Sequence, residues 1–277
     1  MTITVNDEVF EDDAIYRELE ALKQEAMQRG EDVNCCERDS EFMPLAQERL
    51  IAQALVHQQA LADGIEVADA EVETALAEYR ENYGEPEEVD AWRERVARNL
   101  RTRAALAIVC GDPDSSDDAL RAFYDAHIQL YMNPRRVRVS HIIKRPEHGV
   151  DSQEQFTGLC ELRKQLQAGA NFAEIASAHS DMPEEGGDLG AFAAGEFDPQ
   201  IEAIAFSLDT GEISPVFLTS YGFHIATVTG IEEPGPIPFD DVQEQIREDL
   251  VLTHNGTRTS EYVESLKAKA KIEEKED

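Results

Sequence analysis

Apolar residues recur every three or four positions through the first half of the chain, with polar residues between them. This spacing is typical of amphipathic helices, whose apolar stripes turn toward a core. The predicted helices span about residues 13–29, 45–63, 69–79, 88–110 and 116–131. A shared hydrophobic core explains all five stripes most simply. We therefore predict an all-helical N-terminal arm over residues 1–134.

After Pro134 the period of the apolar residues changes from that of a helix to that of a strand. Val137, Val139, His141 and Ile143 share one face of a predicted strand, so a histidine lies beside three aliphatic side chains. Helices are predicted at 153–168, 172–179 and 199–208, and two more strands at 216–219 and 223–228. This order predicts a small α+β domain over residues 135–231, in which helices cover an antiparallel sheet.

The last part of the chain begins with a proline-rich linker, residues 233–238. Apolar residues then repeat every four positions over 242–250 and resume beyond an interruption at Asn255-Gly256. We predict that residues 232–277 form a linker and a C-terminal helical segment that packs on the arm. Residues 273–277 are expected to be a frayed tail.

Acidic residues dominate the composition, with 58 Asp and Glu against 25 Lys and Arg and a formal net charge of −33. Nucleic-acid binding requires a basic stripe, and an anionic membrane surface also attracts basic side chains. The composition therefore argues against both partners. A heavily hydrated surface, of the kind suited to high salt, explains the acidity, and the alternative is an acidic field that steers basic clients.

Four cysteines, Cys35, Cys36, Cys110 and Cys160, show neither a CxxC pair nor the spacing of a zinc site. This pattern is typical of a reducing compartment. The first residues lack the basic and apolar regions of a signal peptide, and no apolar run approaches a membrane span. We therefore expect a cytoplasmic protein without a metal or a cofactor.

Five blocks of sequence resemble the parvulin family of peptidyl-prolyl cis-trans isomerases. They are VSHII at 139–143, NFAEIASAHS at 171–180, GGDLGAF at 186–192, AFSLDTGEISPV at 205–216 and TSYGFHIATV at 219–228. The helical half is similar, through residues 50–76, to the arms of parvulin-type chaperones. The run FDPQIEAIAFSL at 197–208 most resembles the nitrogenase-maturation isomerases of this family. The resemblance implies a parvulin-like domain on a client-binding arm.

The resemblance also implies a set of catalytic residues. His141 and His224 match the paired sheet histidines of the family, and their expected role is to hold each other and nearby hydroxyls in one tautomer. Thr219 matches the family hydroxyl before the second histidine, and Tyr221 precedes Gly222. The position after the His-Ser pair, often Cys or Asp in relatives, is Met182 here, unless the alignment slides to Asp181.

The proline-binding residues implied by the resemblance are Leu189, Phe192, Phe197 and Ile201. Ile201 stands where relatives have an aromatic residue, which together with Met182 predicts a slow isomerase. Lys144 and Arg145 are interpreted as a solvated turn.

The sequence thus predicts a foldase that isomerises Xaa-Pro bonds of unfolded or maturing protein clients held by the arm. The alternative is a chaperone or maturation adaptor that uses the parvulin fold only to bind. The sequence leaves the oligomeric state open.

Overall fold

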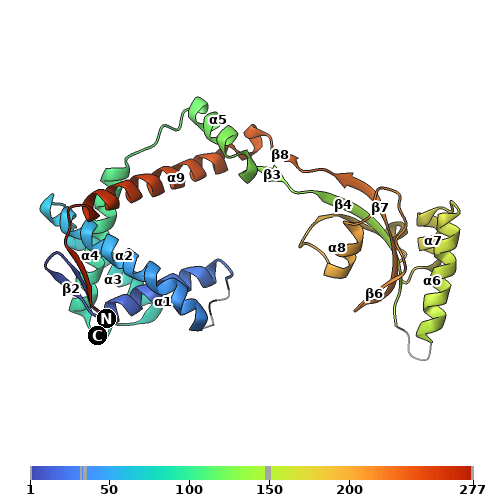
Figure 1. The fold of residues 1–277 in the computed structure, drawn as a ribbon, viewed down its shortest axis with the longest axis horizontal. Coiled ribbons are helices and arrows are strands. Elements are labelled where there is room, and N and C mark those ends of the chain that lie inside the picture. Colours follow the sequence, from blue (N-terminus) through green and yellow to red (C-terminus); the bar gives the residue numbers. More distant parts are fainter. Residues whose placement is uncertain (1, 32, 34–35, 147–150, 276–277) are drawn as a thin grey trace. The chain divides into compact units, whose positions relative to one another are not determined.

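The computed structural model describes the whole chain except residues 1, 32, 34–35, 147–150 and 276–277. Two compact units make up the chain (Figure 1). The helical unit contains Met1–Leu120 and Glu244–Asp277, and the sheet unit contains Arg121–Gln243. Cys110 and Cys160 are free thiols. Cys35 and the side chain of Cys36 lie outside the described residues.

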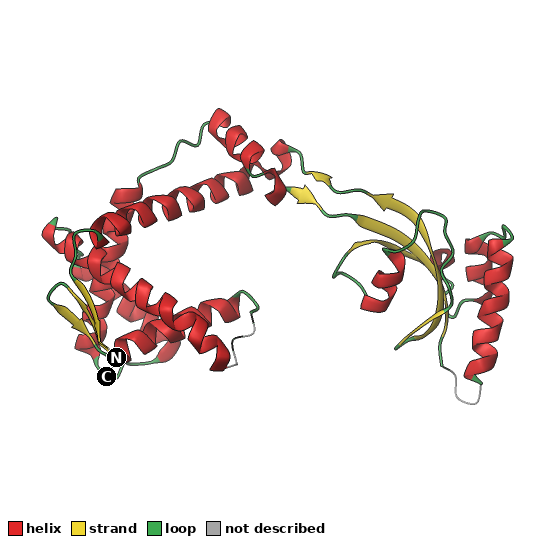
Figure 2. Cartoon of the chain, viewed as in Figure 1, coloured by secondary structure: helices red, strands yellow, loops and turns green. Residues whose placement is uncertain are grey.

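Helices form most of the helical unit, as the apolar periodicity predicts (Figure 2). They are α1 (Asp12–Gln28), α2 (Cys36–Ala62), α3 (Asp69–Tyr83), α4 (Val89–Cys110), the start of α5 (Asp117–Ala126) and most of α9 (Phe239–Lys267). Helix α9 runs without a break through Asn255 and Gly256, so the expected interruption is wrong. A glycine costs a helix only about 1 kcal/mol, which the burial of residues such as Ile246 and Val263 can offset.

A small antiparallel sheet joins the two ends of the chain within this unit. Its strands are β1 (Thr2–Val5), β2 (Glu8–Phe10) and β9 (Ile272–Lys275), in the order β2-β1-β9. Residue Val5 of β1 pairs with Ile272 of β9. The arm is therefore not purely helical, and the expected frayed tail is wrong for the part that forms β9. Glu276 and Asp277 lie outside the described residues.

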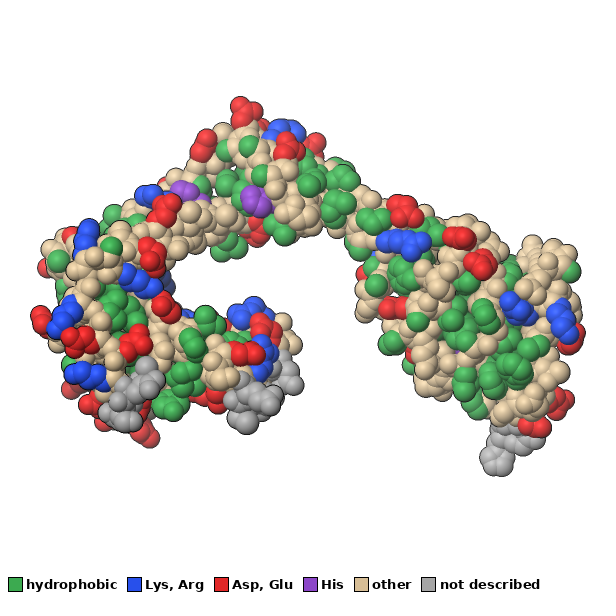
Figure 3. Space-filling model, in the orientation of Figure 1, with side chains coloured by type: hydrophobic (Ala, Val, Ile, Leu, Met, Phe, Trp, Pro, Cys, Tyr) green, Lys and Arg blue, Asp and Glu red, His purple; other side chains and the backbone are tan. Residues whose placement is uncertain are grey.

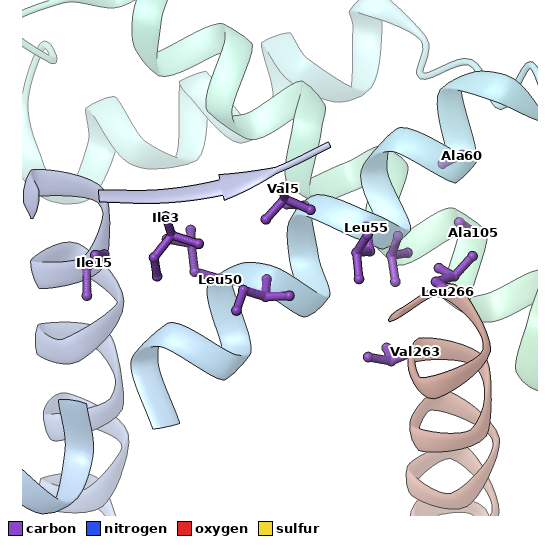
Figure 4. Packing of buried hydrophobic residues seen from close by; sticks show 12 residues of the cluster. Ile3, Val5, Ile15, Leu50, Leu55, Ala60, Ala105, Val263 and Leu266 are labelled. Carbon is purple, nitrogen blue, oxygen red and sulfur yellow. The ribbon is translucent and has the colours of Figure 1, made fainter. Parts of the chain in front are cut away.

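The core of the helical unit combines residues from both ends of the chain (Figure 4). Ile3 and Val5 are fully buried because alternate residues of β1 face the helices. They lie in one cluster with Leu55 of α2 and with Val263 and Leu266 of α9. The C-terminal helix thus contributes apolar side chains to the core built by the first half of the chain.

The sheet unit contains a four-stranded antiparallel sheet in the order β5-β4-β7-β6. The strands are β4 (Arg136–Lys144), β5 (Asp188–Ala193), β6 (Phe217–Thr219) and β7 (Gly222–Glu232), and the helices are α6 (Ser152–Gln167), α7 (Phe172–His179) and α8 (Pro199–Ala205). The predicted α+β class is confirmed. The sequence did not predict β5, which is the glycine-containing segment after the loop at Gly186 and Gly187.

The two faces of this sheet are covered by different helices (Figure 1). Ile142 and Ile225 pack against α6 and α7, whereas Val139 and Val228 pack against α8. Side chains alternate along a strand, so the α8 face of β4 also carries His141. By the same alternation, residue 224 of β7 shares the face of Val228. Both histidines therefore lie on the α8 face.

Two further short strands, β3 (Met132–Asn133) and β8 (Gly235–Pro236), pair with each other and tie the proline-rich linker to the segment before β4. Tyr131 is fully buried and stacks on Tyr124, whose hydroxyl donates to the carbonyl of Ile237 at 2.7 Å. The predicted domain boundaries after residues 134 and 231 fall inside the sheet unit and stay a prediction.

Candidate functional site

Two buried histidines contact each other on the α8 face of the sheet. In the antiparallel register of β4 and β7, Ile143 lies opposite His224, which places His141 diagonally across from it. The two Nδ1 atoms are 3.3 Å apart, and the rings are tilted by 37° with their centres 5.4 Å apart. His141 is 4% exposed and His224 is 1% exposed. Eighty-three residues of sequence separate them, and the sheet register brings them together.

A hydroxyl group continues this hydrogen-bond chain. Thr219 Oγ1 lies 2.8 Å from His224 Nε2 and already accepts the main-chain N–H of Tyr221 at 3.0 Å. We assign the hydroxyl proton to the bond with His224 Nε2, which makes that nitrogen an acceptor. In this tautomer His224 donates its Nδ1–H to His141 Nδ1, so the proton of His141 is on Nε2. Phe217 stacks on the His224 ring at 5.3 Å and holds its plane.

Both imidazoles are held in the neutral form. Burial, followed by the charge of Arg145, lowers the pKa of His141 to about 4. Burial, followed by the neighbouring His141, lowers the pKa of His224 to about 4. At neutral pH the pair is therefore a fixed donor and acceptor chain rather than a source of protons.

A cavity of about 440 Å³ opens beside the two rings. Its lining comes from β4, β5, α8, β7 and the loops next to them, and it is mainly apolar. The lining residues are His141, Ile143, Arg145, Met182, Leu189, Glu196, Phe197, Asp198, Ile201, Tyr221 and His224. A mainly apolar cavity with a few convergent polar groups is the usual form of a ligand site.

Seven of the ten site residues that the sequence predicts line this cavity, and Thr219, Phe192 and Asp181 do not. Thr219 acts on the site through His224. Phe192 is buried behind the cavity and stacks on Phe197, with ring centres 4.8 Å apart and a tilt of 13°. It supports the wall of the cavity.

Asp181 and Met182 are neighbours in the loop after α7, but their side chains line different cavities. Asp181 turns to the other side, where its carboxylate accepts from Lys144 Nζ at 2.7 Å and from the main-chain N–H of Arg145 at 2.8 Å. Asp181 lines a neighbouring cavity, whereas Met182 lines the cavity beside the histidines. The roles of both residues stay a prediction.

Four lining residues are absent from the sequence-based set: Ile143, Arg145, Glu196 and Asp198. The strand alternation that places His141 also places Ile143, so this residue could have been found. Asp198 caps α8 by accepting the N–H groups of Gln200 and Ile201, and Glu196 accepts from the main-chain N–H of Ala193. Only the folded loops bring the two carboxylates and Arg145 to the rim.

Comparisons with known proteins identify the family to which the chain belongs. A family model described as the PPIC-type PPIASE domain matches residues 115–244. A protein named foldase PrsA from Caldanaerobacter subterraneus is 30% identical over 229 residues, which are 81% of this chain and 68% of that protein. The chain belongs to the parvulin family. This parvulin is a peptidyl-prolyl cis-trans isomerase and a foldase.

Two further similarities are found at lower identity. A putative peptidyl-prolyl isomerase named NifM from Azotobacter chroococcum is 27% identical over 183 residues, which are 63% of this chain and 62% of that protein. A solved structure of a SurA-like chaperone from Campylobacter jejuni covers 98% of both chains at 20% identity, with a TM-score of 0.41.

The predicted cytoplasmic location is wrong, because the PrsA relatives are foldases outside the cytoplasm. Scattered cysteines and the composition of the first residues do not determine a compartment. Among the described residues, none of the helices combines the length and the apolar character that a bilayer crossing requires. In the same part of the chain, no group of three or more His, Cys, Asp or Glu side chains is arranged to hold a metal ion.

Proposed function

We propose that the cavity beside His141 and His224 is the isomerase site and receives the proline of a client Xaa-Pro bond. The observation that carries this proposal is the neutral, hydrogen-bonded histidine pair at the edge of an apolar cavity. Leu189, Phe197 and Ile201 supply an apolar seat for the proline ring. The rim carries charges of both signs, which contact the peptide on either side of the proline.

Rotation about a prolyl bond requires no nucleophile and no bond cleavage. The barrier is roughly 18–20 kcal/mol because the planar amide loses its resonance in the twisted state. In that state the carbonyl oxygen carries less negative charge, and the prolyl nitrogen regains a lone pair. A site that binds the twisted amide better than either planar form accelerates both directions equally.

The histidine pair provides such a preference in our proposal. With the tautomers assigned above, the Nε2–H of His141 has no hydrogen-bond partner among the described residues. A donor that meets the prolyl nitrogen stabilises only the twisted state, because the planar nitrogen has no free lone pair. Thr219 and His224 fix the ring that carries this donor, so little reorganisation is needed during rotation.

The helical unit is proposed to hold apolar segments of the client. Several large apolar side chains of this unit are exposed, among them Tyr16, Leu45, Tyr83 and Ile108. A client bound through such residues would present its prolines at a raised effective concentration. This arrangement suits an isomerase whose own cavity binds peptide weakly.

NMR exchange spectroscopy on a set of Xaa-Pro peptides tests the proposed site with the full chain. We expect faster cis–trans exchange with the wild type and its loss in the His141→Ala, His224→Ala double variant. His254→Ala, a histidine substitution in the helical unit, serves as the control and should keep the wild-type rate. A double variant with unchanged exchange would refute the proposed site.

A second candidate function is client binding without turnover at this cavity. Met182 and Ile201 favour it, because relatives place other residue types at the matching positions. Peptide signals that shift on addition of the protein, without any acceleration of exchange, would establish this alternative and reject catalysis at this site.

A further inference from the structure

The helical unit contains a polar cavity of its own. It has a volume of about 570 Å³ and is lined by residues of α1, α2 and α4. The lining residues are Arg17, His57, Leu61, Ala91, Glu94, Arg95, Ala97, Arg98 and Arg101. Four arginines against one carboxylate is an unusual ratio in a chain with a net charge of −33.

The sequence of α4 explains why the arginines gather there. Ala91, Glu94, Arg95, Arg98 and Arg101 recur at three- and four-residue spacing, so they occupy one face of the helix. Over most of the helical unit, basic and acidic side chains are interspersed in the view of Figure 3. The face of α4 at this cavity instead concentrates positive charge.

Two of the four arginines are already paired with carboxylates. Arg17 donates to Asp13 at 2.6 Å, one helical turn away on α1. Arg98 donates with both terminal nitrogens to Glu8 and stacks over the ring of Phe10. These pairs fix the walls of the cavity.

The other two arginines retain unused donors. Arg101 donates its Nε–H to the carbonyl of Ile65 at 3.0 Å, which anchors the side chain and leaves both terminal NH₂ groups without a partner among the described residues. Arg95 forms no hydrogen bond or ion pair with any residue in the described part of the chain. Guanidinium groups at such positions bind oxyanions through paired hydrogen bonds.

The His57 ring lines the cavity beside the arginines and responds to their charge. His57 is only 9% exposed, and its Nδ1 is buried without a hydrogen-bond partner among the described residues. Burial, followed by the charges of Arg98 and Arg101, lowers the pKa of His57. The Nδ1 atom is closed off from the cavity, so the ring senses a bound anion through its charge rather than through a hydrogen bond.

We propose that this cavity binds an oxyanion, a carboxylate or a phosphate, held by Arg95 and Arg101. The terminal NH₂ groups of the two arginines bind the anion oxygens, and the His57 ring forms part of the cavity wall. The anion is either a free ion or a carboxylate presented by a polypeptide. This site is separate from the proposed isomerase function and does not depend on it.

Calorimetric titration of the full chain at low ionic strength tests the proposal, since salt screens such contacts. The probes are inorganic phosphate and two peptides that differ only in a free or an amidated C-terminal carboxyl group. We expect one site per chain, and at least ~10-fold weaker binding in Arg95→Gln, Arg101→Gln, since two charge-assisted hydrogen bonds are lost. Arg103→Gln, an exposed arginine of the same helix outside the cavity, is the control for loss of positive charge from this helix and should bind as the wild type.

NMR titration of the His57 ring provides a second readout. A bound anion raises the pKa of His57 toward or above its ordinary value, and this rise should disappear in the double variant. Binding of phosphate alone assigns the site to a free ion, and binding of the free-carboxyl peptide but not its amide assigns it to a polypeptide carboxylate. Absence of binding by every probe, or equal binding by the double variant and the wild type, overturns the proposal.

Discussion

The neutral histidine pair predicts an unusual pH dependence of both stability and activity. An ordinary histidine has a pKa near 6.5, whereas burial lowers the pKa of His141 and of His224 to about 4. At pH values between about 4 and 6.5, the two histidines bind protons in the unfolded chain but not in the folded chain. The contribution of the pair to stability is therefore fully present above pH 6.5, declines as the pH falls, and is lost below about pH 4.

The magnitude follows from the number of protons involved. Near pH 5, unfolding of the sheet unit takes up nearly two protons at these rings, which corresponds to roughly 2 kcal/mol of lost stability per pH unit. Some solvent access to the cavity reduces this value. Isomerase activity should stay constant from about pH 8 to pH 5, because the folded pair remains neutral, and should fall only as the pH approaches 4.

Two measurements check this reasoning. The ¹³Cε1 signals of the two rings report their protonation directly, and urea denaturation at pH 7 and pH 5, followed through methyl signals of the buried Ile142 and Ile225, reports the stability of the sheet unit. Fluorescence of Trp92 is unsuitable, because this residue belongs to the helical unit. The 58 acidic residues also titrate, so the pH dependence of stability in the wild type is compared with that of the His141→Gln, His224→Gln double variant, which lacks both imidazoles. Ring signals that titrate near pH 6.5, or equal pH slopes in the two proteins, would refute the argument.

Four substitutions test other parts of the sheet unit. Thr219→Val removes the hydroxyl that fixes His224 and should slow peptide exchange about tenfold, while the melting temperature of the sheet unit changes little. Gly187 and Gly190 both have a φ of 79°, a backbone conformation that costs an alanine about 1–2 kcal/mol. Gly187→Ala and Gly190→Ala should therefore both destabilise the sheet unit. At Gly187 the new Cβ would also lie 2.1 Å from a carbonyl oxygen of β4, so urea denaturation should show about 2 kcal/mol more destabilisation there than at Gly190, where the space is open. Met182→Asp should raise the exchange rate if Met182 limits turnover, and an unchanged rate would reject that role.

The sequence predicted the limits of helices α6 and α7 closely. For α7 the predicted and observed limits coincide, and for α6 they differ by one residue at each end. Strands β1 and β9 were missed because each is four residues long and its partner lies about 270 residues away. A short strand of this kind exists only through pairing, which periodicity within the segment does not reveal.

Strand β5 of the sheet unit was also missed because it depends on pairing with another strand. Its sequence contains Gly190 and follows two further glycines, a composition that favours a loop. Pairing with β4, in which Val137 lies opposite Phe192, makes it a strand. The histidine pair was found only because the family resemblance connects two motifs that are 83 residues apart.

The choice between Asp181 and Met182 depends on loop register, which spacing in the sequence cannot determine. Ser180 Oγ accepts the main-chain N–H of Ile143 at 3.2 Å, and the N–H of Asp181 donates to the carbonyl of Ile143 at 2.9 Å. These bonds fasten the loop to the edge of β4, one residue before Met182. A shift by one residue would break both and would separate the Asp181 carboxylate from Lys144. The fold therefore presents a thioether rather than a carboxylate to the cavity at this position, and the proposed isomerase site has Met182 beside its histidine pair.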